Sequence, residues 1–152
     1  MTTKEKNATS NPSQQAKRSL YVTGKTVRLG DTDSAGRWFY PRWIEMAHEV
    51  YEEWLDKSGL PLAEVMRLPV ILPVTRCEAV FSKPARLGDR LECTLVLVDI
   101  RDKAFTLECC ALLGGEVLAR CVTTHVAVDK LANCSVLLPE VVRNLFSGCV
   151  VQ

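Results

Sequence analysis

The chain has 152 residues, of which 47% are hydrophobic and 24% are charged, and its formal net charge is +1. This is the length of one domain and the composition of an ordinary soluble globular protein. No apolar run approaches the roughly 20 residues that a membrane span needs, and the N-terminus lacks the apolar stretch of a secretory signal. We therefore expect a cytoplasmic protein that does not bind membranes.

The positive charges form no Lys/Arg-rich run and no basic helix face. Proteins that bind nucleic acid usually carry such a basic stripe, so we expect no nucleic-acid partner. A polyanionic small molecule is still compatible with a few cations that converge locally.

The cysteines indicate neither a metal site nor a disulfide framework. None of them forms the C-x-x-C spacing of zinc sites and dithiol redox centres. Most lie in apolar, strand-like segments, where a free thiol behaves as a small hydrophobic group. We expect buried or incidental thiols in a reducing compartment, and no metal. The seven are Cys77, Cys93, Cys109, Cys110, Cys121, Cys134 and Cys149.

The first third of the chain predicts a tail, a strand and a long helix. Residues 1–19 are polar and predict an N-terminal tail, and residues 20–152 predict one compact domain. A strand is predicted over Tyr21–Leu29. A helix is predicted over Pro41–Lys57, because Pro suits the first helical turn and Gly59 suits a stop just past the last one. Its apolar residues recur at spacings of three and four: Trp43, Ala47, Val50 and Trp54.

The rest of the chain predicts four consecutive strands between two short helices, Pro61–Leu68 and Pro139–Phe146. The strand segments are rich in Val, Leu, Thr and Phe and alternate with period two. Gly114-Gly115 between two of them indicates a tight hairpin. The predicted strands are Val70–Phe81, Asp89–Asp99, Ala104–Leu113 and Glu116–Asp129.

This order predicts an α+β fold. Consecutive strands form an antiparallel sheet, and a helix with one apolar stripe must cover one face of it. The other sheet face would carry Val96, Val98, Val122 and Val126, which is too apolar to face water. We therefore expect a homo-oligomer.

The segment Gly30-Asp31-Thr32-Asp33-Ser34-Ala35-Gly36 is the best candidate for chemistry. It also suits an ordinary turn, since Asp, Ser and Gly all favour turns. It does not suit a calcium loop, because Ala35 and Arg42 would occupy ligand positions. The helix start that follows offers unpaired N–H donors that can stabilise an oxyanion. A carboxylate just upstream, such as Asp33, can then attack an acyl carbon or activate water.

The run from Gly30 to Pro41, GDTDSAGRWFYP, resembles the signature of 4-hydroxybenzoyl-CoA thioesterases and their hotdog-fold relatives. The similarity spans about Val22 to Asp129. It implies a hotdog fold, in which an antiparallel sheet wraps around one long central helix. It implies that Asp33 is the nucleophile or general base, that Tyr40 donates its backbone N–H to the thioester carbonyl, and that Trp38 and Phe39 contact the substrate.

The resemblance also implies an assembly and a coenzyme A site. The family works as a dimer, often paired into a tetramer, with sites across the subunit interface and with no cofactor beyond the coenzyme A of the substrate. Arg101 and Lys103 match two cations that bind coenzyme A phosphates, a role that suits their charge. Asp102 between them departs from the hydroxybenzoyl enzymes, which have a cation there.

A few positions resemble the branch that hydrolyses 1,4-dihydroxy-2-naphthoyl-CoA in quinone biosynthesis, in particular His48-Glu49-Val50-Tyr51-Glu52 and Thr124-His125-Val126. The resemblance implies that His48 contacts the acyl ring or a ring hydroxyl, although a position at the edge of the apolar stripe explains His48 at least equally well. His125 lies among apolar residues and is expected to be structural.

The predicted function is therefore hydrolysis of a hydroxyaryl acyl-CoA, with 1,4-dihydroxy-2-naphthoyl-CoA first, 4-hydroxybenzoyl-CoA second and a short aliphatic acyl-CoA third. Two alternatives of other classes stay open: a hotdog hydratase or dehydratase that uses His48, and a non-catalytic acyl-CoA binder. The chain has no G-x-S-x-G nucleophile elbow, P-loop or dinucleotide fingerprint.

Overall fold

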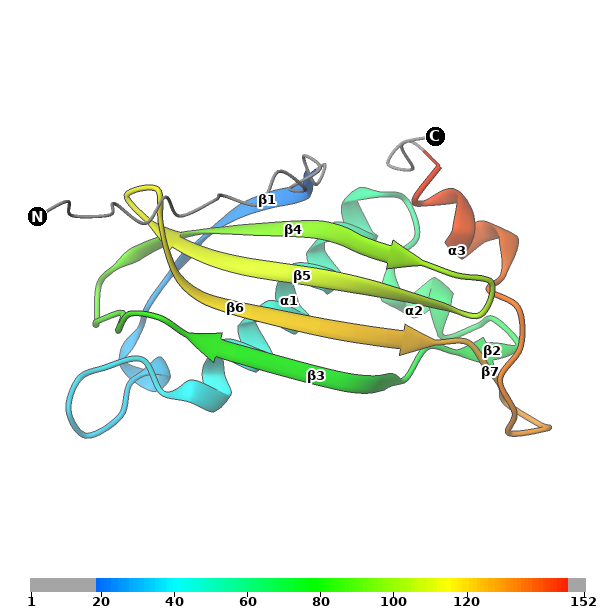
Figure 1. Cartoon of the computed structure of the whole chain (residues 1–152), viewed down its shortest axis with the longest axis horizontal. Helices are drawn as coiled ribbons and strands as arrows, with labels where there is room; N and C mark the ends of the chain where they lie inside the picture. The colour runs from blue at the N-terminus through cyan, green and yellow to red at the C-terminus, as the bar shows by residue number, and fades with distance from the viewer. Residues whose placement is uncertain (1–18, 148–152) are drawn as a thin grey trace, which may run out of the picture.

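A computed structural model describes residues 19–147 of the chain, so the predicted tail up to residue 18 lies outside the described residues, as does Cys149. Five antiparallel strands form the main sheet in the order β1-β4-β5-β6-β3 (Figure 1). Ala111 on β5 faces Cys93 on β4 and Ala119 on β6, so three small buried residues lie side by side across the three inner strands. The strands are β1 (Ser19–Thr26), β3 (Val74–Phe81), β4 (Arg90–Ile100), β5 (Ala104–Leu113) and β6 (Glu116–Val126).

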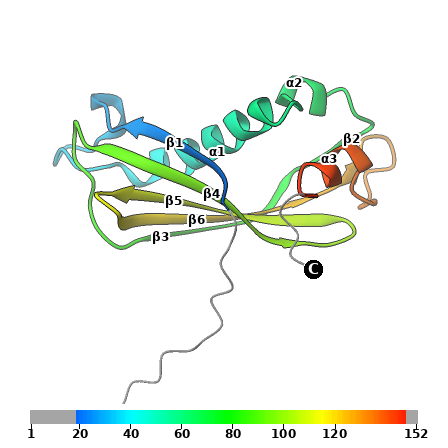
Figure 2. The same cartoon turned by 90° about the horizontal axis from the view of Figure 1, so that it is seen from above.

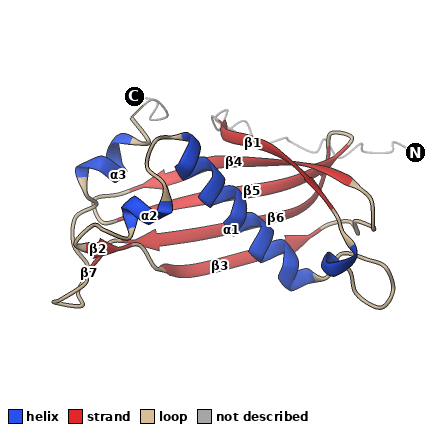
Figure 3. Ribbon diagram, turned by 180° about the vertical axis from the view of Figure 1, so that it is seen from behind, coloured by secondary structure: helices blue, strands red, loops and turns tan. Residues whose placement is uncertain are grey.

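The long helix α1 (Tyr40–Lys57) crosses one face of this sheet (Figures 2 and 3). Its apolar stripe faces the strands and forms the middle of the core. The short helices α2 (Leu62–Val65) and α3 (Glu140–Asn144) lie on the same side as α1. The buried residues of α1 are Trp43, Met46, Ala47, Val50, Tyr51, Trp54 and Leu55.

The structure confirms the α+β architecture and corrects several element bounds. The predicted strand Tyr21–Leu29 ends at Thr26, because the chain turns into a short 3-10 helix, η1 (Leu29–Asp31). The predicted strand Val70–Phe81 is broken into β2 (Val70–Ile71) and β3, since Pro73 has no N–H to donate to a ladder. β7 (Val128–Asp129) leaves the main sheet and pairs with β2.

The Gly114-Gly115 hairpin between β5 and β6 is confirmed. Both residues have positive φ angles, 59° and 83°, which a tight two-residue turn requires and only Gly adopts freely.

None of the described cysteines forms a disulfide. Cys93, Cys109 and Cys121 are buried, and burial raises the pKa of Cys93 to about 12, so this thiol stays protonated and packs as an apolar group. Cys77 and Cys134 are exposed, so the thiols are not uniformly buried.

One core residue gives a direct test of this packing. Phe105 is buried and its ring lies 5.1 Å from that of Phe146. Phe105→Ala should lower the free energy of unfolding by about 3–5 kcal/mol, because it leaves a cavity between the sheet and Phe146, which follows α3. Urea denaturation measures this. The control Val22→Ala, at a site that is 50% exposed, should change it by less than about 1 kcal/mol.

Candidate active site

The loop that carries Asp33 lies between η1 and α1 and rests against the connection from β3 to β4. The backbone N–H of Trp38 donates to the carbonyl of Ala85 at 3.0 Å. The backbones of Arg37 and Arg86 form an isolated antiparallel β-bridge. These contacts fix the loop at the end of the sheet where β4 begins.

Asp31 organises the loop from inside. Its side chain is buried, and its Oδ2 accepts the backbone N–H of Arg28 at 2.8 Å. Its Oδ1 accepts Nε of Arg42 at 3.0 Å, and its own carbonyl accepts the N–H of Phe39 at 2.8 Å. All of these groups belong to the protein itself, so Asp31 is a structural residue that joins the end of β1 to the start of α1.

Asp33 differs from Asp31 because it is exposed. Its Oδ1 accepts the backbone N–H groups of Ala35 at 2.8 Å and Arg37 at 3.1 Å, which fixes the carboxylate in a tight turn. Its Oδ2 accepts no hydrogen bond from the part of the chain that the structure describes. The carboxylate is therefore oriented by one oxygen and has the other free for chemistry.

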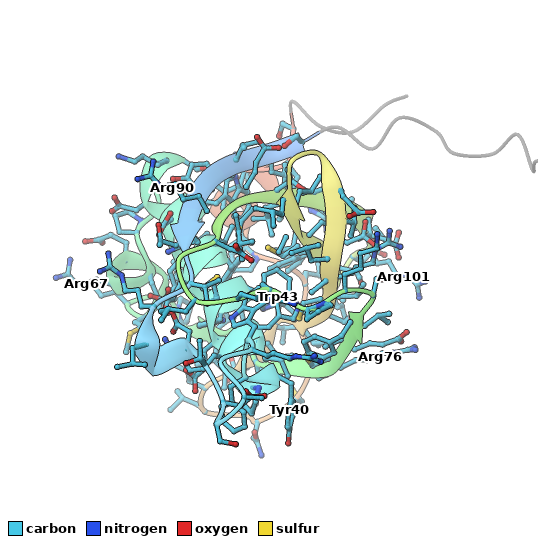
Figure 4. All side chains as sticks on the ribbon, turned by 90° about the vertical axis from the view of Figure 1, so that its left-hand side faces the viewer. Tyr40, Trp43, Arg67, Arg76, Arg90 and Arg101 are labelled. Carbon is cyan, nitrogen blue, oxygen red and sulfur yellow. The ribbon has the colours of Figure 1, made fainter. Side chains whose placement is uncertain are left out.

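Asp33 and Tyr40 line the same pocket, of about 300 Å³, which we call the loop pocket. Tyr40 is the first residue of α1, and no described residue accepts its backbone N–H. This N–H is one of the unpaired donors of a helix start, where the helix dipole favours negative charge. Figure 4 shows Tyr40 at the surface and Trp43 of the same helix inside the core.

Trp38 and Phe39, the two predicted substrate contacts, have different surroundings. Trp38 also lines the loop pocket, but its ring packs on Trp43 with centroids 5.1 Å apart. Phe39 caps α1 and is exposed, with its ring against that of Tyr40 at 5.6 Å. Trp38 therefore supports the wall of the pocket, whereas Phe39 projects from the surface beside it.

A second pocket, which we call the apolar pocket, has a volume of about 450 Å³ and lies between α1 and the sheet. It begins at Ile44, four residues or about 6 Å along the helix axis from Tyr40. His48 lines it with a half-exposed side chain, and its Nε2 lies 3.1 Å from a carboxylate oxygen of Glu52. The apolar pocket can hold an aromatic group, and His48 stands at its rim.

His125 is buried, as expected, but it also lines the apolar pocket. Its ring stacks on Phe105 with centroids 4.8 Å apart, and the Tyr51 ring lies 4.8 Å away on α1. Burial lowers the pKa of His125 to about 4, so the imidazole is neutral near pH 7.

Arg101 and Lys103, the predicted coenzyme A contacts, belong to the turn between β4 and β5. Figure 1 shows this turn at the end of the sheet opposite to the loop that carries Asp33. β4 runs from Arg90, at the end of the sheet that carries the loop pocket, to Ile100, and these 11 residues span about 30 Å. Both side chains are exposed; Arg101 pairs with Asp99 at 2.7 Å, and Lys103 donates to the Ser135 carbonyl at 3.3 Å. One chain does not bring them together with Asp33.

Phe81 and Lys83 line the loop pocket from the end of β3, although no sequence pattern indicated them as site residues. The Phe81 ring lies edge-on to the Tyr40 ring at 6.5 Å, and Lys83 pairs with Glu116. No local pattern connects this segment to the Asp33 loop, because the sheet topology alone brings them together.

Residues 19–147 contain neither a candidate metal cluster nor a helix that could span a membrane. No three His, Cys, Asp or Glu side chains there are grouped so as to hold a metal ion. No helix in that range has both the length and the apolar character that crossing a membrane requires.

Comparisons with known proteins identify the fold and family. A 1,4-dihydroxy-2-naphthoyl-CoA thioesterase from Synechocystis superimposes with a TM-score of 0.77 and 27% identity, over 82% of this chain and 93% of that one. A gentisyl-coenzyme A thioesterase superimposes with a TM-score of 0.72 and 26% identity, over 81% and 99%. An antiparallel sheet with one long helix across it is thus the hotdog fold of thioester hydrolases.

The model of the Thioesterase-like superfamily matches residues 27–146, and this chain belongs to that family. Among curated relatives, the 1,4-dihydroxy-2-naphthoyl-CoA hydrolase of Gloeothece citriformis is 31% identical over 80% of this chain and 87% of its own length.

The two aspartates should respond differently to substitution. Asp31→Ala leaves the Arg28 N–H and the Arg42 guanidinium without their acceptor, and should lower the free energy of unfolding by about 2 kcal/mol. Asp33→Asn keeps an oxygen for the turn and should change it by less than about 1 kcal/mol. Thermal and urea denaturation measure both, and equal losses would contradict the assigned difference.

Proposed function

We propose that this thioester hydrolase acts on 1,4-dihydroxy-2-naphthoyl-CoA in quinone biosynthesis, with Asp33 as its catalytic carboxylate. The observation that carries the proposal is the loop pocket, which is lined both by Asp33 with its free Oδ2 and by Tyr40 with its unpaired N–H. The naphthoyl relatives support the choice of acyl group.

In the proposed reaction the thioester carbonyl oxygen accepts the Tyr40 N–H, and the helix dipole stabilises the charge that develops on it. Asp33 either attacks the carbonyl carbon, giving an aspartyl anhydride that water then hydrolyses, or removes a proton from an attacking water. In both routes the carbon–sulfur bond breaks and coenzyme A leaves as a thiolate, which takes up a proton. Neither route needs a metal or a redox cofactor.

The acyl group is proposed to lie along α1 in the apolar pocket. That pocket starts one helical turn beyond Tyr40 and reaches His48, about 12 Å along the axis. Its walls are mainly aliphatic and thiol side chains, which suit a flat aromatic ring system. His48 at the rim is proposed to contact that ring system.

Coenzyme A is proposed to bind Arg101 and Lys103 of a second subunit, because the same chain places them about 30 Å from the loop pocket. β3 is an edge strand of the sheet, and its exposed Val74, Val80 and Phe81 support an interface there. A two-fold axis beside β3 would reverse the direction of the partner's sheet. The end of that sheet with Arg101 and Lys103 would then lie on the same side as the Asp33 loop of this chain. We propose a dimer, paired into a tetramer, in the cytoplasm.

A hydratase is the second candidate, since His48 and Glu52 form a His–acid pair at 3.1 Å on the central helix. That function would use His48 and would leave Asp33 without a role. Among thioesterase substrates, 4-hydroxybenzoyl-CoA and a short aliphatic acyl-CoA rank after the naphthoyl ester, and the gentisyl-CoA enzyme shows that a related fold accepts a hydroxybenzoyl-type group.

The chemistry is tested by thiol release from a panel of acyl-CoAs. Asp33→Asn should lower kcat by about 10²–10⁴-fold, because it removes the carboxylate and keeps the turn. His48→Ala should mainly raise KM. A hydratase would release no thiol and would instead add water to an enoyl-CoA, an activity that His48→Ala should abolish and Asp33→Asn should leave unchanged. A wild-type protein that binds acyl-CoA, releases no thiol and hydrates no enoyl-CoA would be a binder.

The shared site is tested by hybrid dimers. The double variant Arg101→Ala, Lys103→Ala should raise KM about tenfold, since two phosphate contacts are lost. The control Arg67→Ala changes an exposed residue beside Glu64 and should leave KM unchanged.

A hybrid of the double variant with Asp33→Asn contains one intact site if the two groups come from different subunits. Its kcat/KM should then exceed that of both parent dimers. Activity no higher than the mean of the parents would place all groups of a site in one chain.

A further inference from the structure

A hydrogen-bonded pair, Thr123 and His125, lies on the sheet side of the apolar pocket. Both residues are on β6 and both line the pocket, with Oγ1 of Thr123 3.2 Å from Nε2 of His125. The His125 ring is held between Phe105 and Tyr51, so its orientation is fixed by packing on both faces. The proposed mechanism gives this pair no role.

The other ring nitrogen decides which way the hydrogen bond runs. Nδ1 of His125 lies 3.3 Å from the Leu72 carbonyl, which can only accept, so Nδ1 carries the proton. The ring is neutral, because burial lowers its pKa to about 4. Nε2 is then a bare acceptor, and Thr123 must donate its single hydroxyl proton to it. The Thr123 oxygen therefore offers only lone pairs to the pocket.

The Thr123 oxygen is a half-buried acceptor in an apolar pocket, so it suits a ligand whose hydrogen-bond donor reaches the same position in the pocket. The remaining lining on the sheet side is apolar or thiol, including Leu95, Leu107 and Cys121. On 1,4-dihydroxy-2-naphthoyl-CoA the hydroxyl at C1 is next to the thioester and can donate to its carbonyl. The hydroxyl at C4 has no internal partner.

We propose that Thr123 accepts a hydrogen bond from the acyl-ring hydroxyl that is remote from the thioester, and that His125 is the positioning residue that makes Thr123 an acceptor. The inference rests on the proposed function and names a determinant of its substrate specificity. A ring with a hydroxyl at this position donates a hydrogen bond to Oγ1 of Thr123, whereas a ring with only hydrogen leaves that acceptor unpaired. A ring with an ether oxygen places a second acceptor against Thr123, which is unfavourable.

The test compares kcat/KM for 1,4-dihydroxy-2-naphthoyl-CoA with that for 1-hydroxy-2-naphthoyl-CoA, which lacks only the remote hydroxyl. Thr123→Val should reduce the preference for the dihydroxy ester about tenfold, the worth of one neutral hydrogen bond. Thr123→Ser keeps the hydroxyl and should keep the preference. Thr94→Val makes the same change outside the pockets described above and should leave both rates unchanged.

The role of His125 is tested with a third substrate, the 4-methoxy analogue. His125→Phe keeps a ring between Phe105 and Tyr51 and removes Nε2, so the Thr123 hydroxyl becomes free to donate. The rate ratio of the methoxy to the dihydroxy ester should rise severalfold in this variant. A merely structural role would slow both esters alike and leave the ratio unchanged, which would overturn the role of His125.

The two levels of the proposal fail differently. A wild-type enzyme that hydrolyses none of the three naphthoyl esters would overturn the proposed function. A wild-type enzyme that hydrolyses them, with a preference that Thr123→Val leaves intact, would overturn the role of Thr123 alone. If Thr123→Val does not fold, the His125→Phe ratio decides the same question.

Discussion

The buried carboxylate of Asp31 is the interaction on which the site depends. It accepts one hydrogen bond from the backbone at Arg28 and one from the side chain of Arg42, while its carbonyl accepts the N–H of Phe39. These three bonds join the end of the first strand to the first turn of α1. Because both ends of the loop are held, Asp33 and Tyr40 with its unpaired N–H line one pocket without contacting each other. A carboxylate and an oxyanion donor are useful only when their separation is fixed in advance.

The sheet provides the second constraint. Its one helix-covered face forms the core and the walls of the apolar pocket, so the same packing that stabilises the fold also shapes the space for an acyl group. Its length places Arg101 and Lys103 far from Asp33. A single chain therefore has the two groups of residues of the proposed site at opposite ends of the sheet, and this separation is the reason why a second subunit is part of the proposal. The exposed apolar residues of edge strand β3 agree with that requirement.

Much of the fold followed from local sequence patterns. The predicted strand Ala104–Leu113 has the observed bounds, since its alternation is uninterrupted, while Val70–Phe81 was too long because the pattern continues across Pro73. The Asp33 loop was indicated by its position before a helix start and by its resemblance to a family, and its catalytic role stays a prediction. The sequence did not indicate Thr123 or His125 as site residues. Their proposed roles depend on the contact of His125 with the Leu72 carbonyl and on their place in the wall of the apolar pocket. The periodicity of apolar residues indicates which face of a strand or helix a residue occupies. It does not indicate contacts between residues that are far apart in the sequence, such as these.

The most direct measurement is a crystal structure with a thioester analogue in which a methylene group separates sulfur from the carbonyl, so that hydrolysis cannot occur. We predict that the carbonyl oxygen lies within hydrogen-bonding distance of the Tyr40 N–H and that the carbonyl carbon faces Oδ2 of Asp33. The aromatic group would lie along α1 toward His48, and the phosphates would contact Arg101 and Lys103 of the partner subunit. An analogue bound with its carbonyl away from Asp33 and Tyr40 would contradict the account, whatever its other contacts.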